Sequence, residues 1–180
     1  MKKLKNKKGF TLVEMLACCI TLLLITGVCT LGTHVALDSY NRSLFVSESQ
    51  MLESTLDLYL GDILRHATIK SDGIVKESGN YGVETISNLS YGMVDGKLEL
   101  QKDTSKAHYG RLLVYKKPTE TEGTMFMSEN VYTSTLYIYD FKLEYNPDGR
   151  YVTGSYIIKS TVVEDAAYEC EFTYRLVTMY

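Results

Sequence analysis

The longest apolar stretch of the chain lies near its N-terminus, from Phe10 to Leu37. Of these 28 residues, only Glu14 and His34 are strongly polar. About 20 apolar residues, rising 1.5 Å each in a helix, span the hydrocarbon core of a bilayer. The pattern therefore predicts a transmembrane helix over residues 10–37.

The helical pattern continues beyond this stretch. Apolar residues recur at the spacing i, i+4, i+7, i+11, i+15, in Leu52, Leu56, Tyr59, Ile63 and Ala67. No proline interrupts residues 10–70. We expect one continuous helix from Phe10 to Ala67, with residues 38–72 as its amphipathic segment, whose apolar stripe packs on a globular domain.

Strand signals replace the helical period after Gly73. Five segments have strand character: Ser90–Val94, Lys97–Gln101, Arg111–Lys117, Tyr151–Ser160 and Tyr168–Val177, with one or two further strands within Val131–Tyr145. Asp95-Gly96 predicts a tight hairpin, and Asn146-Pro147-Asp148-Gly149 predicts a turn in which glycine takes the positive φ. The expected fold is α+β, a long N-terminal helix packed on an antiparallel sheet over residues 73–180.

Charge is distributed unevenly along the chain. The first eight residues hold five lysines and no acid, and without residues 1–9 the formal net charge changes from −3 to −8. The lysines predict a cytoplasmic N-terminus and an extracytoplasmic C-terminal domain. An acidic bulk surface disfavours non-specific nucleic-acid binding. A local basic patch, and with it a role in DNA uptake, is left open.

The residues that most often carry chemistry do not form a recognisable site. Cys18, Cys19 and Cys29 lie in the apolar stretch, so Cys170 has no partner for a disulfide within the C-terminal domain. The three histidines, His34, His66 and His108, lack metal-ligand spacing. No nucleophile or phosphate-loop motif is present. We expect no enzymatic activity, no cofactor and no metal.

Tyrosine is unusually frequent, with 15 tyrosines and no tryptophan in the chain. Most of them lie in the predicted strands. They are expected to pack across strands with their hydroxyl groups at the surface. Alternatively, they form a contact surface for other subunits or for an external ligand.

The junction between the lysines and the apolar stretch reads Lys7-Lys8-Gly9-Phe10-Thr11-Leu12-Val13-Glu14. The apolar stretch is too long for the 7–15-residue core of a secretory signal peptide, and no small-x-small cleavage site closes it. Instead, the junction resembles the type III signal of type IV prepilins. The resemblance implies that a prepilin peptidase removes residues 1–9 by cutting after Gly9 and then methylates the amine of Phe10.

Glu14 needs an explanation because a carboxylate is costly within an apolar helix. One explanation is that its side chain reaches the headgroup region of the bilayer. The resemblance implies another, in which Glu14 pairs with the Phe10 amine of a neighbouring subunit in a filament. The helix-breaking proline of many major pilins is missing here, and Gly27 and Gly32 are the places where the helix could loosen.

The resemblance implies a minor pilin or pseudopilin, a structural subunit of a hetero-oligomeric type IV pilus-like filament. Leu58–Ala67 also looks like the end of the long helix in minor pilins and J-type pseudopilins. The implied partners are the prepilin peptidase, other pilin subunits, the membrane, and an assembly platform protein with its ATPase. The alternative is a single-pass membrane-anchored ectodomain, a surface sensor or adhesin. Adhesion, twitching, DNA uptake and protein secretion all remain open.

Overall fold

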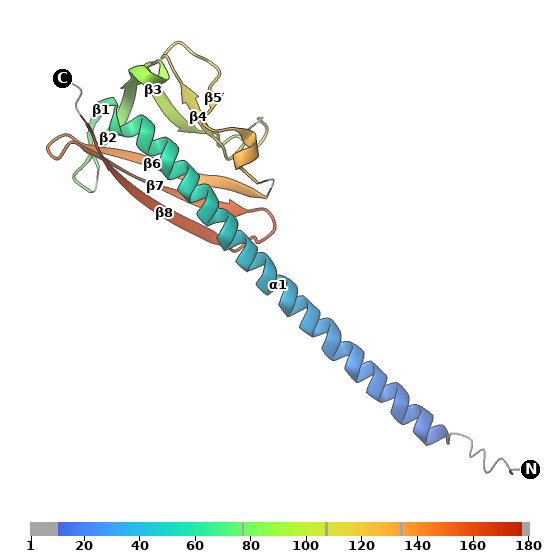
Figure 1. Cartoon of the computed structure of the whole chain (residues 1–180). Coiled ribbons are helices and arrows are strands. Elements are labelled where there is room, and N and C mark those ends of the chain that lie inside the picture. Colours follow the sequence, from blue (N-terminus) through green and yellow to red (C-terminus); the bar gives the residue numbers. More distant parts are fainter. Residues whose placement is uncertain (1–10, 77, 107, 134, 178–180) are drawn as a thin grey trace, which may run out of the picture. The chain divides into compact units, whose positions relative to one another are not determined.

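The computed structural model describes residues 11–76, 78–106, 108–133 and 135–177. The chain divides into two compact units, Met1–Asn41 and Arg42–Tyr180. Both contain part of the same helix, α1, which runs from Leu12 to Arg65 (Figure 1).

Helix α1 is uninterrupted within these bounds, including at Gly27 and Gly32. It ends at Arg65, so the expected end at Ala67 and the segment limit at residue 72 are wrong. The Arg65 carbonyl accepts a 2.6 Å hydrogen bond from the backbone N–H of Val177, and the Ile63 carbonyl accepts one of 2.7 Å from the Asn88 side chain. These bonds satisfy carbonyls that have no partner at a helix end. The chain then enters a strand at Thr68.

The second unit contains a sheet of eight strands, with every recorded pair antiparallel. The strands are β1 (Thr68–Val75), β2 (Tyr81–Asn88), β3 (Met93–Leu100), β4 (Leu112–Tyr115), β5 (Thr124–Met125), β6 (Leu136–Asn146), β7 (Tyr151–Ser160) and β8 (Ala167–Arg175). Two 3-10 turns, η1 (Leu89–Tyr91) and η2 (Glu129–Val131), lie between strands. The order is β5-β4-β3-β2-β6-β7-β8, with β1 pairing β2. The expected α+β fold is confirmed.

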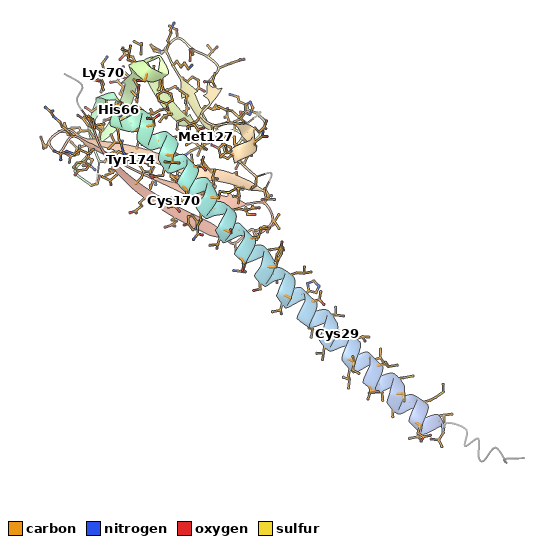
Figure 2. All side chains as sticks on the ribbon, in the orientation of Figure 1. Cys29, His66, Lys70, Met127, Cys170 and Tyr174 are labelled. Atoms are coloured by element: carbon orange, nitrogen blue, oxygen red, sulfur yellow. The ribbon has the colours of Figure 1, made fainter. Side chains whose placement is uncertain are left out.

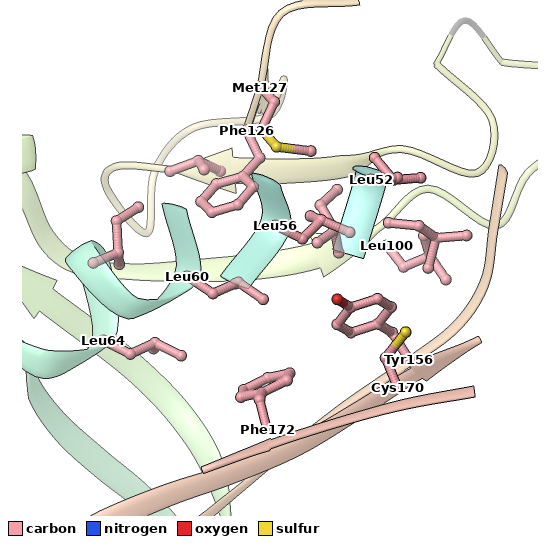
Figure 3. Close-up of a cluster of buried hydrophobic side chains, with 14 of the residues drawn as sticks. Leu52, Leu56, Leu60, Leu64, Leu100, Phe126, Met127, Tyr156, Cys170 and Phe172 are labelled. Carbon is pink, nitrogen blue, oxygen red and sulfur yellow. The ribbon is translucent and has the colours of Figure 1, made fainter. Parts of the chain in front are cut away.

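The core of this unit lies between the second part of α1 and the sheet. Leu52, Leu56, Leu60 and Leu64 follow one another at every fourth position and are at most 2% exposed (Figure 3). Full burial of each leucine contributes about 2 kcal/mol of transfer free energy. Tyr59, which was expected in the buried stripe, is 42% exposed. Leu60 is buried instead, whereas Ile63, also expected in the stripe, is buried as predicted.

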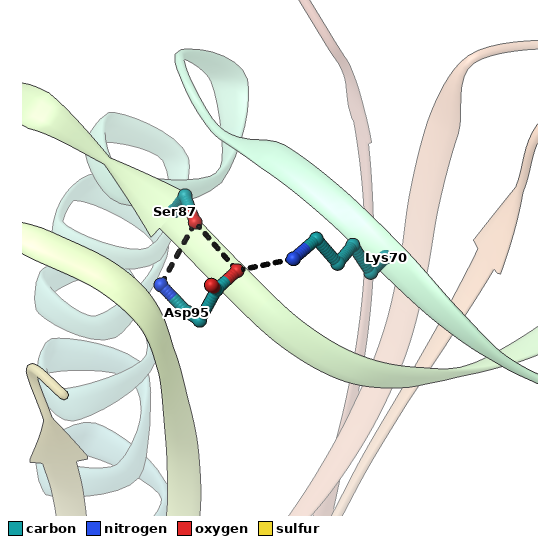
Figure 4. Close-up of polar contacts among 3 residues, drawn as sticks. All are labelled: Lys70, Ser87 and Asp95. Atoms are coloured by element: carbon teal, nitrogen blue, oxygen red, sulfur yellow. Dashed lines mark hydrogen bonds and ion pairs between the residues drawn. The ribbon is translucent and has the colours of Figure 1, made fainter. Parts of the chain in front are cut away.

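The predicted hairpin at Asp95-Gly96 is wrong. Both residues lie inside β3, and the preceding segment contains η1 rather than a strand. Asp95 takes a left-handed conformation, with φ of 49°, at a register shift opposite Ser87. Its backbone N–H donates to the Ser87 hydroxyl over 2.9 Å, and its carboxylate binds Lys70 over 2.7 Å (Figure 4). An Asp-Gly pair thus forms a β-bulge here instead of a turn.

The strands nearer the C-terminus match their predictions closely. Tyr151–Ser160 is β7 with identical bounds, and β8 occupies most of the predicted Tyr168–Val177. The turn between β6 and β7 is also present, and the Asn146 side chain accepts a 2.7 Å hydrogen bond from the N–H of Gly149. The positive φ of this turn belongs to Arg150, at 50°, and not to Gly149 as expected.

Candidate assembly segment

The first turn of α1 is closed by a reciprocal pair of side chains. The hydroxyl of Thr11 accepts a 3.3 Å hydrogen bond from the backbone N–H of Glu14. In return, Oε2 of Glu14 accepts hydrogen bonds of 2.9 Å from both the backbone N–H and the hydroxyl of Thr11. This arrangement is a capping box, in which a threonine and a glutamate three residues later satisfy each other's backbone N–H groups.

The capping box gives Glu14 a function within its own chain. It fixes the residue at which the helix starts, and it places a carboxylate at the positive end of the helix dipole. The sequence pattern Thr-x-x-Glu ahead of an apolar run is a local signal for this capping box.

The predicted processing residues Gly9 and Phe10 lie outside the described residues. Of the three predicted site residues, Glu14 alone is placed, in the first turn of α1.

From Leu12 to Tyr40, α1 exposes side chains on all its faces. Fourteen of the large hydrophobic side chains in this range are at least 49% exposed: Leu12, Val13, Met15, Leu16, Ile20, Leu22, Leu23, Leu24, Ile25, Val28, Leu31, Val35, Leu37 and Tyr40. The helix is long and apolar enough to cross a membrane. A helix that is apolar all round is stable only among lipids or among other apolar helices.

The threonines of this segment do not disturb its apolar character. The hydroxyl of Thr21 donates to the carbonyls of Ala17 and Cys18, and those of Thr30 and Thr33 donate to carbonyls four residues earlier. Each of these hydroxyl groups therefore finds an acceptor within its own helix. An apolar environment can therefore surround these hydroxyl groups at little cost in desolvation free energy.

The cysteines divide between the two units, and all four are free. Figure 2 shows Cys29 on the apolar part of α1 and Cys170 on β8. Cys170 is 3% exposed, and burial raises the pKa of its thiol to about 12. Cys170 is therefore a core side chain and not a reactive thiol.

Acidic residues on the second part of α1 bind phenol groups of the sheet unit. The hydroxyl of Tyr168 donates to Glu53 over 2.7 Å, and the hydroxyls of Tyr174 and Tyr91 donate to Asp57 and Asp62. The partners of these carboxylates lie 29 or more residues away in the chain, so no local sequence signal identifies them.

A hollow of the second unit adjoins these carboxylates. It has a volume of about 440 Å³, and its lining includes Asp57, Asp62, Arg65, His66 and Tyr91. Among the described residues, no group of three or more histidines, cysteines and acids is placed to hold a metal ion. Both aspartates already accept tyrosine hydroxyls, so we assign this hollow no chemistry.

The architecture is pilin-like, since one long apolar N-terminal helix continues onto an antiparallel sheet. Comparison of the chain with protein-family models, with curated proteins and with solved structures finds no match in any of the three.

Proposed function

We propose that this chain is a structural subunit, a minor pilin or pseudopilin, of a type IV pilus-like filament. In this proposal it is a substrate of the prepilin peptidase and not an enzyme. It inserts in the membrane with its lysines in the cytoplasm and its sheet unit outside. A platform protein and its ATPase then move it from the membrane into a filament of several pilin subunits at the cell surface.

The observation that carries the proposal is the apolar part of α1, exposed on every face and capped at Thr11 and Glu14. A helix of this kind can exchange lipid for other helices with little change in its surroundings, because both are apolar. The helix starts directly after Gly9-Phe10, where the prepilin resemblance puts the processing cut. Processing would therefore leave a helix with almost no chain before it, suited to tight axial packing.

In a filament, Glu14 would face other helices instead of water. A carboxylate in such surroundings needs a cation, and the new amine of Phe10 on a neighbouring subunit is one. The capping box would have to share or release the carboxylate in that event. We propose that Glu14 serves both as helix cap and as register contact.

The apolar helix by itself also suits a second function. A helix that is long enough to cross a bilayer would suffice to anchor a surface sensor or adhesin. In that case, Gly9-Phe10 would match a prepilin signal by chance and the chain would not enter filaments.

Mass spectrometry of the native N-terminus separates the two functions. The filament subunit is expected to begin at N-methyl-Phe10, whereas a simple anchored protein retains its lysine-rich start. A Gly9→Val variant is the matched control, because a branched side chain before the cut should leave the precursor uncleaved. An unprocessed wild-type chain in cells that contain a prepilin peptidase would contradict the proposed function.

A further inference from the structure

The sheet of the second unit forks at β2. One edge of β2 pairs with β1 along its length. The other edge pairs with β3 near the C-terminal end of β2 and with β6 near its N-terminal end. Within the described residues, no strand pairing joins β3 to β6. The two strands therefore diverge, and side chains of the β3 end and of β6 line a groove between them.

This groove, called the fork groove below, consists of two adjoining hollows of about 330 and 340 Å³. Both hollows include Gln101 and Lys102, which directly follow β3. The first is completed by Tyr109, Ile138, Tyr139 and Asp140. The second is completed by the end of β3, by Asp103 and by Phe141.

A bulge in β6 presents an aromatic ring at the groove. Ile138 pairs with Ile158 and Asp140 with Ile157, which leaves Tyr139 as the extra residue. Tyr139 is 52% exposed. Its ring is held by Lys159, whose ammonium lies 3.9 Å from the ring centroid. Bulges commonly redirect a side chain toward a site.

A second ring and a fixed carboxylate lie in the same hollow. Tyr109 is 36% exposed, and its ring centroid lies 5.6 Å from that of Tyr137. The Asp140 carboxylate binds the ammonium groups of Lys102 and Lys142, each over 3.2 Å. Rings and carboxylate are therefore positioned before any ligand arrives, which reduces the entropy cost of binding.

The charges of the groove select against polyanions. Its lining carries three carboxylates, from Glu99, Asp103 and Asp140, and one ammonium, from Lys102. The ammonium is already paired with Asp140. A nucleic acid or an acidic polymer would therefore meet these carboxylates, while the neighbouring ammonium groups of Lys142 and Lys159 are engaged by Asp140 and by the Tyr139 ring.

We propose that the fork groove binds a neutral oligosaccharide. The C–H face of a sugar ring packs on an exposed tyrosine ring, and sugar hydroxyls donate to Asp140 and accept from the Gln101 amide or Lys102. Two adjoining hollows that share Gln101 and Lys102 suit successive sugar units better than a single compact metabolite. The inference concerns the sheet unit alone and does not depend on the proposed filament role.

The test uses the full chain in lipid nanodiscs, which avoids detergents with sugar headgroups. Maltohexaose, cellohexaose and chitohexaose are titrated up to millimolar concentration and followed by calorimetry and by saturation-transfer NMR. We expect at least one of the three to bind and the single-stranded oligonucleotide dT12 not to bind. Binding of dT12 alone, or of none of the four probes, would overturn the proposal.

Three variants locate the binding. Tyr139→Ala should weaken the affinity about tenfold through loss of the stacked ring. Tyr139→Phe should retain it, because the ring remains. Tyr59→Ala, at a tyrosine that is 42% exposed on α1 outside the groove, should bind as the wild type does. Unchanged binding in Tyr139→Ala, or equal loss in Tyr59→Ala, would overturn the assignment. If Tyr139→Ala fails to fold, Tyr109→Ala serves in its place with the same expectation.

Discussion

Glu14 is proposed to act both as helix cap and as register contact between subunits, and different substitutions can separate these two functions. Glu14→Gln keeps a hydrogen-bond acceptor for the capping box but removes the charge. Thr11→Ala removes the capping hydroxyl but keeps the charge, at about 1 kcal/mol of helix stability. We expect Glu14→Gln and Glu14→Ala to lower filament incorporation about tenfold, since a buried amine would lose its partner. Membrane insertion and cleavage should persist in all three variants.

The measurement is the fraction of processed subunit in sheared filaments, quantified by immunoblot. If the capping box alone explains Glu14, Thr11→Ala and Glu14→Ala will be impaired to the same degree while Glu14→Gln behaves normally. That pattern would remove the register role.

Asn88 joins the end of α1 to the sheet through a side chain that is 1% exposed. Its amide donates to the Ile63 carbonyl over 2.7 Å, and its Oδ1 accepts from the backbone N–H groups of Ser90 and Tyr91. Asn88→Leu leaves these buried groups without partners, so we expect a loss of about 2–4 kcal/mol in unfolding free energy. Urea unfolding of the full chain in nanodiscs measures this loss in unfolding free energy. Asn130→Ala, an exposed asparagine of η2, should change stability by less than about 0.5 kcal/mol.

Tyr132 makes stability sensitive to alkaline pH. It is 5% exposed, and burial raises its pKa to about 12. Between the unfolded pKa of about 10 and the folded value, the folded state retains the proton that the unfolded state loses. Stability should therefore fall as pH rises from 10 to 12, by about 2 kcal/mol from this residue. Unfolding curves at several pH values should show a smaller fall in Tyr132→Phe. An equal fall in both proteins would contradict this role.

Among the elements, the bulge in β3 depends on a residue that tolerates a positive φ. Aspartate and asparagine enter the left-handed region more readily than other non-glycine residues. Asp95→Asn should therefore keep the bulge but lose the ion pair with Lys70, whereas Asp95→Val should also strain the backbone. We expect the valine variant to be the less stable of the two by about 1–2 kcal/mol, measured by urea unfolding.

The Asp95 carboxylate also makes the stability of the folded state depend on pH in the acidic range. The hydrogen bond from Lys70 lowers the pKa of Asp95. A lowered folded pKa stabilises the folded state above the unfolded pKa of about 4, and this contribution is lost as pH falls through the folded value. The stability difference between wild type and Asp95→Asn should therefore be present at neutral pH and disappear in acid. A difference that grows toward acid pH would show that Lys70 is not the partner that matters.

Local patterns predicted some elements well and failed where distant residues decide the outcome. The bounds of β7 and the buried positions Leu52, Leu56 and Ile63 of α1 were predictable because burial on one face repeats along an element. The dipeptide Asp95-Gly96 is locally ambiguous because it suits a hairpin or a bulge, and the contact with Ser87 decides between them. The capping box is local and was predictable. The fork groove was not, since Gln101 and Tyr139 come together only through the pairing of the sheet.

For the whole molecule, the five lysines before the helix determine the expected orientation in the membrane. Residues 10–180 carry a formal charge of −8, and basic residues flanking the first apolar helix tend to stay in the cytoplasm. We therefore expect the sheet unit to face the outside. A C-terminal epitope tag should be removed by protease added to intact spheroplasts, and a cytoplasmic control protein should survive.

A variant without the N-terminal lysines tests whether their charge determines the orientation of the chain in the membrane. Changing Lys2, Lys3, Lys5, Lys7 and Lys8 to glutamine removes the basic flank while leaving the apolar helix intact. If the lysines set the orientation, a larger fraction of the tag becomes protected in this variant. The glutamines should not affect the length or hydrophobicity of the helix, so a loss of membrane binding is not expected.

A fully accessible tag in both proteins would show that translocation of the sheet unit is driven by the helix itself. A fully protected tag in the wild type would place the sheet unit in the cytoplasm and exclude both the filament subunit and the surface sensor or adhesin.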